Sequence, residues 1–192
     1  MASTNNLRPF RDYDEHDVVN LFAFSSATSL PQNKGTFVTI SAGWNNAYAD
    51  STLASSLQET ELLGDVGVNA GNTVSDRYGL VAQVKVTATG DSAPLGISLW
   101  DCKETDENGE KLVFNPRKAA EMQAVISGQA VPVATKGMFV YSGVLGTPAI
   151  NGSCYVGTDG VLSATGNASA KVVGKFLGTK DAQNNVLFKL EL

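Results

Sequence analysis

The chain has 192 residues, of which 43% are hydrophobic, and its formal net charge is −5. This length and composition are typical of a globular protein of one or two domains that buries a core of its own. Phosphate binding needs clustered Lys and Arg, so the acidic balance and the singly spread lysines argue against DNA, RNA or an anionic membrane as the main partner.

The first segment, residues 1–34, is predicted to be an arm. Asn, Ser and Pro alternate there with charged and bulky apolar residues, and no period of 2 or 3.6 is sustained. About 30 extended residues reach on the order of 100 Å, which is enough to cross a neighbouring subunit. The alternative that the sequence leaves open is that residues 18–24 pack back on the chain's own barrel.

If the arm binds a partner, its large apolar side chains would fill pockets and its arginines would pair with carboxylates. We expect the contacts to come from eight residues, namely Arg8, Phe10, Arg11, Tyr13, His16, Leu21, Phe22 and Phe24.

His16 is the single histidine of the chain and lies among Asp12, Asp14, Glu15 and Asp17. Neighbouring residues point in different directions on a helix or strand, so this run does not fit a metal site. A nucleophile with a histidine base has no other candidate, and His16 lies in the least regular segment. We therefore predict no catalytic residue, no metal and no cofactor, and interpret His16 as a polar contact.

Residues 35–76 are interpreted as one strand followed by an extended region. The string TFVTIS, residues 36–41, predicts the strand. Residues 42–76 are rich in Gly, Ser and Asn, with a short helix over 53–63 as one option. A stretch of this length without clear elements is usually functional or extended along a partner.

Residues 77–192 show the strongest β pattern. AQVKVTAT, residues 82–89, alternates apolar and polar side chains, as a strand with one face on a core does. Residues 96–101 are expected to pair with 111–114 across a turn at Asn108–Gly109. Asn115–Pro116 then predicts a helix of one turn at most over residues 117–123, before another strand.

Further short strands follow at regular intervals, with turns at pairs such as Lys136–Gly137, Asn151–Gly152 and Asn184–Asn185. They are expected over 131–134, 138–144, 153–157, 161–164, 171–177 and 186–192. This spacing predicts an all-β, mainly antiparallel fold. The predicted architecture is a small barrel or sandwich with an extended N-terminal arm and at most one or two short helices.

The two cysteines, Cys102 and Cys154, form no C-x-x-C motif and are predicted to be buried free thiols. No cationic and apolar leader opens the sequence, and no apolar run reaches the ~18 residues of a membrane span. We expect assembly in a cytoplasm. The acids Asp101, Glu104, Asp106 and Glu107 fall at a hairpin tip, where carboxylates are usually solvated and not paired for glycoside hydrolysis.

The string WDCKETDENGEKLVFNPRKAAEMQAVISGQAVPVATKGMFVYSGV, residues 100–144, resembles virion structural proteins of tailed phages, particularly marine and cyanobacterial ones. The ending KVVGKFLGTKDAQNNVLFKLEL, residues 171–192, is similar to that of small β-barrel capsid decoration proteins. The resemblance spans residues 100–192, about half of the chain, and carries no active-site residue.

This resemblance implies a decoration, or cement, protein on the capsid surface of a virion assembled in the host cytoplasm. Its partners would be the major capsid protein and copies of itself, as a dimer or trimer, with neither nucleic acid nor membrane involved. A second hypothesis is a tail, baseplate or fibre module in which Trp44, Tyr48 and Trp100 stack on host glycans. A third is a polysaccharide-degrading enzyme.

Overall fold

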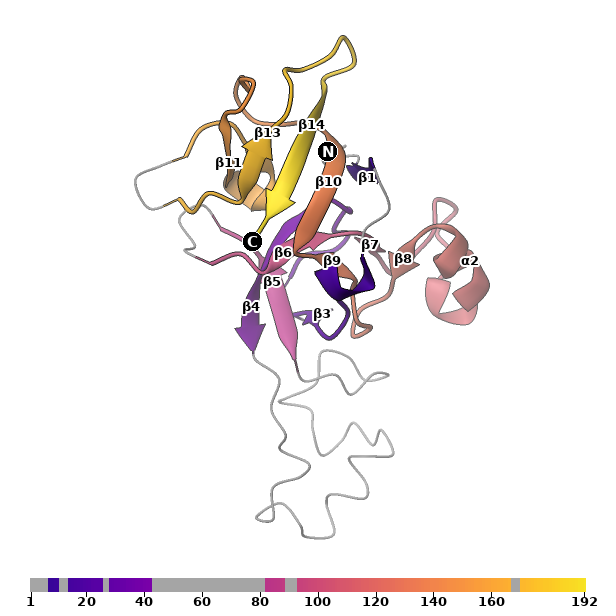
Figure 1. Cartoon of the computed structure of the whole chain (residues 1–192). Helices are drawn as coiled ribbons and strands as arrows, with labels where there is room; N and C mark the ends of the chain where they lie inside the picture. Colours follow the sequence, from indigo (N-terminus) through magenta and orange to yellow (C-terminus); the bar gives the residue numbers. More distant parts are fainter. Residues whose placement is uncertain (1–6, 11–13, 26–27, 43–81, 89–92, 167–169) are drawn as a thin grey trace, which may run out of the picture.

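Two six-stranded sheets pack face to face in the computed structural model, which describes residues 7–10, 14–25, 28–42, 82–88, 93–166 and 170–192 (Figure 1). The first sheet contains, in spatial order, β1 (Leu7–Pro9), β10 (Lys136–Ser142), β14 (Asn185–Glu191), β13 (Gly174–Phe176), β11 (Ser153–Val156) and β12 (Leu162–Ser163). The second contains β2 (Val18–Val19), β9 (Val133–Ala134), β6 (Gly96–Ser98), β4 (Phe37–Ala42), β5 (Gln83–Val86) and β3 (Ala23–Phe24).

A side lobe adds a two-stranded sheet of β7 (Asp101–Cys102) and β8 (Ala124–Val125) and the helix α2 (Pro116–Glu121). Within the described ranges, three short 3₁₀ helices complete the elements: η1 (Glu15–Asp17), η3 (Leu112–Phe114) and η4 (Thr158–Gly160). Strand pairs are antiparallel except β3 with β5 and β7 with β8. The predicted all-β sandwich is confirmed. The helix option at 53–63 and the rest of the expected extended region, 43–76, lie outside the described residues.

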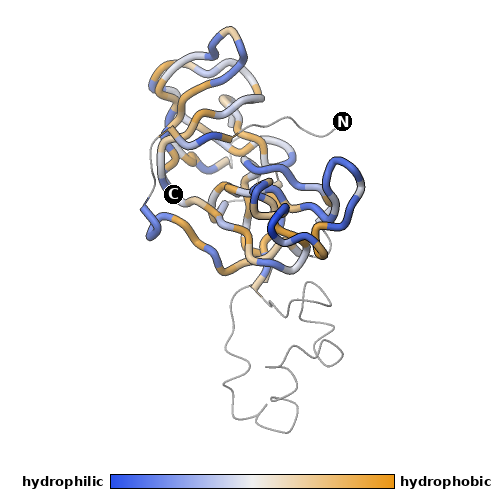
Figure 2. Tube along the Cα trace, turned by 90° about the vertical axis from the view of Figure 1, so that its right-hand side faces the viewer, coloured by the Kyte–Doolittle hydropathy of each residue, from blue (hydrophilic) through white to orange (hydrophobic). Residues whose placement is uncertain are grey.

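Aromatic side chains fill the space between the two sheets. Phe139, Tyr141 and Phe188 are fully buried, and the Phe188 ring centroid lies 6.0 Å from each of the other two. Tyr141 also joins the turn at Gly35 to β12, since its hydroxyl donates to the Gly35 carbonyl at 3.0 Å and accepts from the Leu162 amide at 3.3 Å. Figure 2 shows hydrophobic stretches of the chain running through the middle of the molecule and hydrophilic stretches at several of the protruding bends.

The second sheet is buried on its other face as well. Val38, Val84 and Val133 point into a second apolar cluster, which Phe22 and Phe24 from the N-terminal segment help to form. The two residues are 7% and 3% exposed, so the segment supplies part of the core.

The N-terminal segment also forms sheet edges. β1 ends the first sheet, and β2 and β3 lie at the two ends of the second. Pro9 suits an edge strand because it has no N–H to donate. The described residues of the predicted arm therefore pack on the chain's own sandwich, which is the alternative left open by the sequence. Contact with a partner stays a prediction, as do the domain limits at residues 34 and 76.

The predicted hairpin of residues 96–101 with 111–114 is wrong. β6 pairs with β4 and β9, and residues 112–114 form η3. The turn at Gly109 is present, with φ at +83°, but it closes a different and shorter hairpin, residues 105–111, in which Thr105 bridges Lys111. Asn115 and Pro116 open α2 as predicted, but the helix has six residues and is therefore longer than the single turn expected.

Candidate binding surface

Two of the predicted contact residues lie at the edge of the first sheet, Arg8 on β1 and Phe10 directly after it. Arg8 is exposed, and its Nη2 donates to Asn185 Oδ1 at 3.3 Å. Phe10 follows the strand, and its amide donates to the Met138 carbonyl at 3.0 Å while its residue surface is 55% exposed. Hydrogen bonds to β10 hold the backbone of this edge, so the position of the Phe10 Cα is fixed while its ring stays exposed.

His16 and Leu21 lie further along the same segment. The Asp14 carboxylate caps η1 by accepting from the His16 amide at 2.9 Å. The Asp17 carbonyl accepts from the amide of Thr135 at 2.8 Å, which joins η1 to the end of β9. His16 is exposed, and Leu21 is 38% exposed.

The predicted contact residues that the structure describes fall into a buried group and an exposed group. Phe22 and Phe24 are core residues, whereas Arg11 and Tyr13 lie outside the described residues. The exposed group is Arg8, Phe10, His16 and Leu21, which we call the N-terminal surface. Because β9 runs directly into β10, the edges made by β2 and β1 follow one side of the sandwich.

Cys102 and Cys154 are buried free thiols, as predicted, and burial is the main cause that raises the pKa of each to about 12. In the part of the chain that the structure describes, no group of three His, Cys, Asp or Glu residues is arranged to hold a metal ion. Nor does any helix there have the length and apolarity to cross a membrane.

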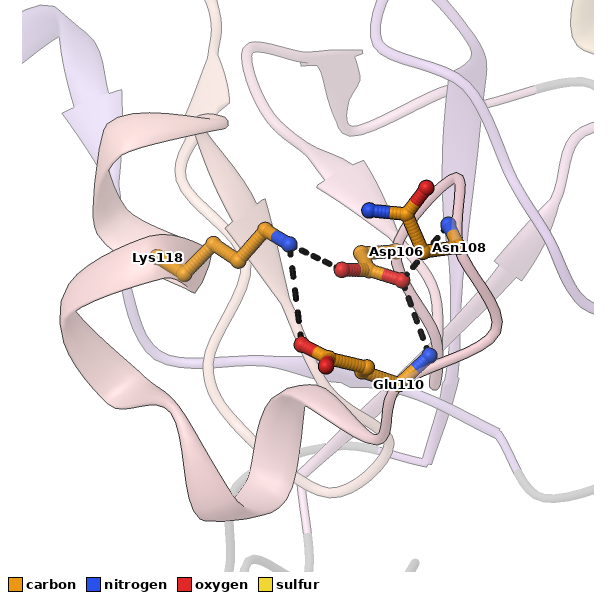
Figure 3. A network of polar contacts seen from close by, with 4 residues as sticks. All are labelled: Asp106, Asn108, Glu110 and Lys118. Atoms are coloured by element: carbon orange, nitrogen blue, oxygen red, sulfur yellow. Dashed lines mark hydrogen bonds and ion pairs between the residues drawn. The ribbon is translucent and has the colours of Figure 1, made fainter.

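The carboxylates of the lobe do not all behave as solvated acids. The Asp106 side chain is 0% exposed and forms an ion pair with Lys118 of α2 (Figure 3). Its Oδ1 accepts from the amides of Asn108 and Glu110, both at 2.8 Å. The hydrogen bond from Lys118 is the main cause that lowers the pKa of Asp106, and the same bond raises the pKa of Lys118.

A cavity of about 570 Å³ lies beside this ion pair, and we call it the hairpin cavity. Its apolar lining is formed by Leu30, Pro31 and Met122, and its polar lining by the run Lys103, Glu104, Thr105, Asp106 and Glu107. Its residues come from three separate parts of the sequence, so no local pattern indicated it.

Trp100 is a packing residue in this structure. It is half-buried and lies against both main apolar clusters of the sandwich. It also lines a smaller, mostly apolar cavity of about 160 Å³ beside α2. Trp44 and Tyr48, which were proposed with it as glycan contacts, lie outside the described residues.

Comparison with models of known protein families and with curated protein sequences found nothing that matches this chain.

Proposed function

We propose that the chain is a structural protein of a tailed-phage virion that binds the outer surface of the head and cements neighbouring capsomers. The resemblance of residues 100–144 and 171–192 to virion and decoration proteins motivates this proposal. A small sandwich with an acidic net charge also suits a surface that faces away from packaged DNA.

The exposed edge at β1 assigns the proposed contact to particular residues. The N-terminal surface combines a sheet edge with an exposed aromatic ring and a cation, at Phe10 and Arg8. Sheet edges present unpaired N–H and C=O groups to another chain, and aromatic and arginine side chains dominate binding energy at protein interfaces. Many copies that each bind only the intact shell stabilise it by mass action, even when single contacts are weak.

Point substitutions test this proposal better than removal of the arm. Deleting residues 1–34 would take away Leu7, Phe22 and Phe24 from the core together with three edge strands, so loss of folding and loss of binding would be confused. Phe10→Ala removes an exposed ring and leaves the β1 pairing to the backbone.

The experiment is cosedimentation of the purified full chain with undecorated phage heads. We expect Phe10→Ala and Arg8→Ala each to weaken binding about tenfold, the effect of losing roughly 1.4 kcal/mol at a contact of this type. Phe114→Ala is the matched control, because Phe114 is 75% exposed on the separate α2 lobe. Undiminished binding of both N-terminal variants, or binding to tails in place of heads, would contradict the proposal.

A further inference from the structure

The walls of the hairpin cavity are held by contacts within the chain, so the cavity is preformed. Asp106 fixes the hairpin tip from inside by accepting two backbone amides, and Lys118 ties this tip to α2. Opposite, Gln32 and Cys102 exchange backbone hydrogen bonds of 2.8 and 2.9 Å, which hold the Leu30–Pro31 segment against β7. A cavity with rigid walls binds at a lower entropic cost than one that must be ordered on binding.

The charges around the cavity are unequally neutralised. Lys103 Nζ lies 3.5 Å from Asp101 Oδ2 and forms an ion pair with it. Lys118 forms ion pairs with Asp106 and, at 3.8 Å from Nζ to Oε2, with Glu110. Within the described part of the chain, neither Glu104 nor Glu107 forms an ion pair. Glu104 uses one oxygen, Oε1, to accept from the Ser127 amide at 3.0 Å. Lys103 and Asp106 line the cavity too, but each has its own ion-pair partner, which leaves Glu104 and Glu107 as the lining carboxylates with free acceptor capacity.

Apart from Thr105 and the paired Lys103 and Asp106, the remaining lining is apolar, and this combination favours a particular side chain. Leu30, Pro31 and Met122 offer a surface for methylene groups, while Glu104 and Glu107 are complementary to a positive head. Arginine has an aliphatic stem and a planar guanidinium with five donors that can serve two carboxylates at once. The volume of about 570 Å³ also lies in the range of roughly 300–1,000 Å³ common for ligand pockets.

We propose that the hairpin cavity receives an arginine side chain of a partner protein, with its stem on Leu30, Pro31 and Met122 and its guanidinium between Glu104 and Glu107. This site is distinct from the N-terminal surface and does not depend on the proposed function. It gives the chain a second, charge-selective contact on the α2 lobe.

The test is an NMR titration of the full chain, labelled with ¹⁵N, with N-acetyl-arginine-N-methylamide. N-acetyl-citrulline-N-methylamide is the matched probe, because it keeps the shape of arginine and lacks the charge. We expect the arginine probe to shift amides of residues 103–107 and to bind about tenfold more tightly than the citrulline probe, the ratio expected when charge-assisted hydrogen bonds to carboxylates are lost.

Two variants locate the effect. Glu107→Gln should weaken the arginine probe several-fold and leave the citrulline probe unchanged. Glu121→Gln is the control, since Glu121 lies on the same lobe, pairs with Arg117 at 3.1 Å and is no part of the cavity lining. Equal affinity for the two probes, shifts confined to other regions, or an equal loss in both variants would overturn the proposal.

Sedimentation equilibrium adds a second readout. A monomer that binds the arginine probe supports a cavity open to another protein. A dimer that dissociates when either Arg117→Gln or Glu107→Gln is introduced would show that a second copy fills the cavity, and this result would overturn the assignment to a different partner protein.

Discussion

The space between the two sheets and the α2 lobe are stabilised by different chemistry. Between the sheets, the rings of Phe139, Tyr141 and Phe188 pack against one another within the larger apolar cluster. The lobe has a small apolar cluster around Leu112, and a buried carboxylate holds its hairpin to its helix. Because the larger apolar cluster lies between the sheets, we expect the sandwich to contribute most of the free energy of unfolding. The lobe holds charged groups in a fixed arrangement.

The largest effect is expected from the aromatic core. Phe188→Ala removes a ring that contacts both Phe139 and Tyr141, and large-to-small changes of this kind cost about 3–5 kcal/mol. Urea unfolding measures the loss. Lys189→Ala is the neighbouring control and should change stability by less than about 1 kcal/mol, because its ion pair with Glu191 is exposed. Similar losses in both variants would show that the rings are not the centre of stability.

A smaller and local effect is expected in the lobe. Asp106→Ala leaves the amides of Asn108 and Glu110 without their acceptor and Lys118 without its principal partner. We predict faster hydrogen exchange at these two amides and in α2, with little change in β10 and β14. Exchange that rises equally throughout the sandwich would contradict the separation of the two regions.

The sign of the pH dependence follows from the same pair. The pKa of Asp106 is lowered from 3.8, so its stabilisation is present above that value and is lost as pH falls through the folded-state pKa. The pKa of Lys118 is raised from 10.5, so its contribution is present below that value and lost at higher pH. Lobe protection should be constant between about pH 5 and 9.

Protection factors measured across this range check the prediction. Asp106→Asn should reduce the loss of protection at low pH for the lobe amides. The sandwich should still lose protection at low pH, because the pKa values of Asp181 and Glu191 are also lowered. An acid limb unchanged by the substitution would assign the effect to other groups.

The smallest effect on stability is expected at the N-terminal surface. Phe10→Ala should change the free energy of unfolding by about 0.5 kcal/mol or less, because the ring is exposed and the strand is held through its backbone. Urea unfolding beside the cosedimentation assay separates binding from folding at this residue. A large stability loss would mean that the ring packs on its own molecule.

Much of the sandwich could be predicted because burial alternates along its longer strands. In β14, Val186, Phe188 and Leu190 are buried while Lys189 and Glu191 are exposed, which is the pattern in the sequence.

The strands of the N-terminal segment could not be recognised in this way. β2 and β3 have two residues each, which is too short to show a period. The Lys136–Gly137 pair gave a turn signal but begins β10, where Gly137 has φ at +144° and an added Cβ would come within 2.9 Å of the Phe139 ring.

The candidate site was predictable only in part. The composition of the N-terminal segment predicted eight partner contacts, but it could not tell the exposed residues from the core residues Phe22 and Phe24. The burial of Asp106 was missed because an acid in a turn sequence normally indicates solvent exposure, and the partner that changes this, Lys118, lies on another element. Pairing between elements is a property of the fold and leaves no local signal.

The most direct test of the central claim is a cryo-EM reconstruction of phage heads incubated with the full chain. The account predicts density for the two-sheet sandwich on the outside of the head between capsomers, with β1 and Phe10 turned toward a capsid subunit. Heads without this density, or a sandwich bound with its β1 edge facing solvent, would contradict it.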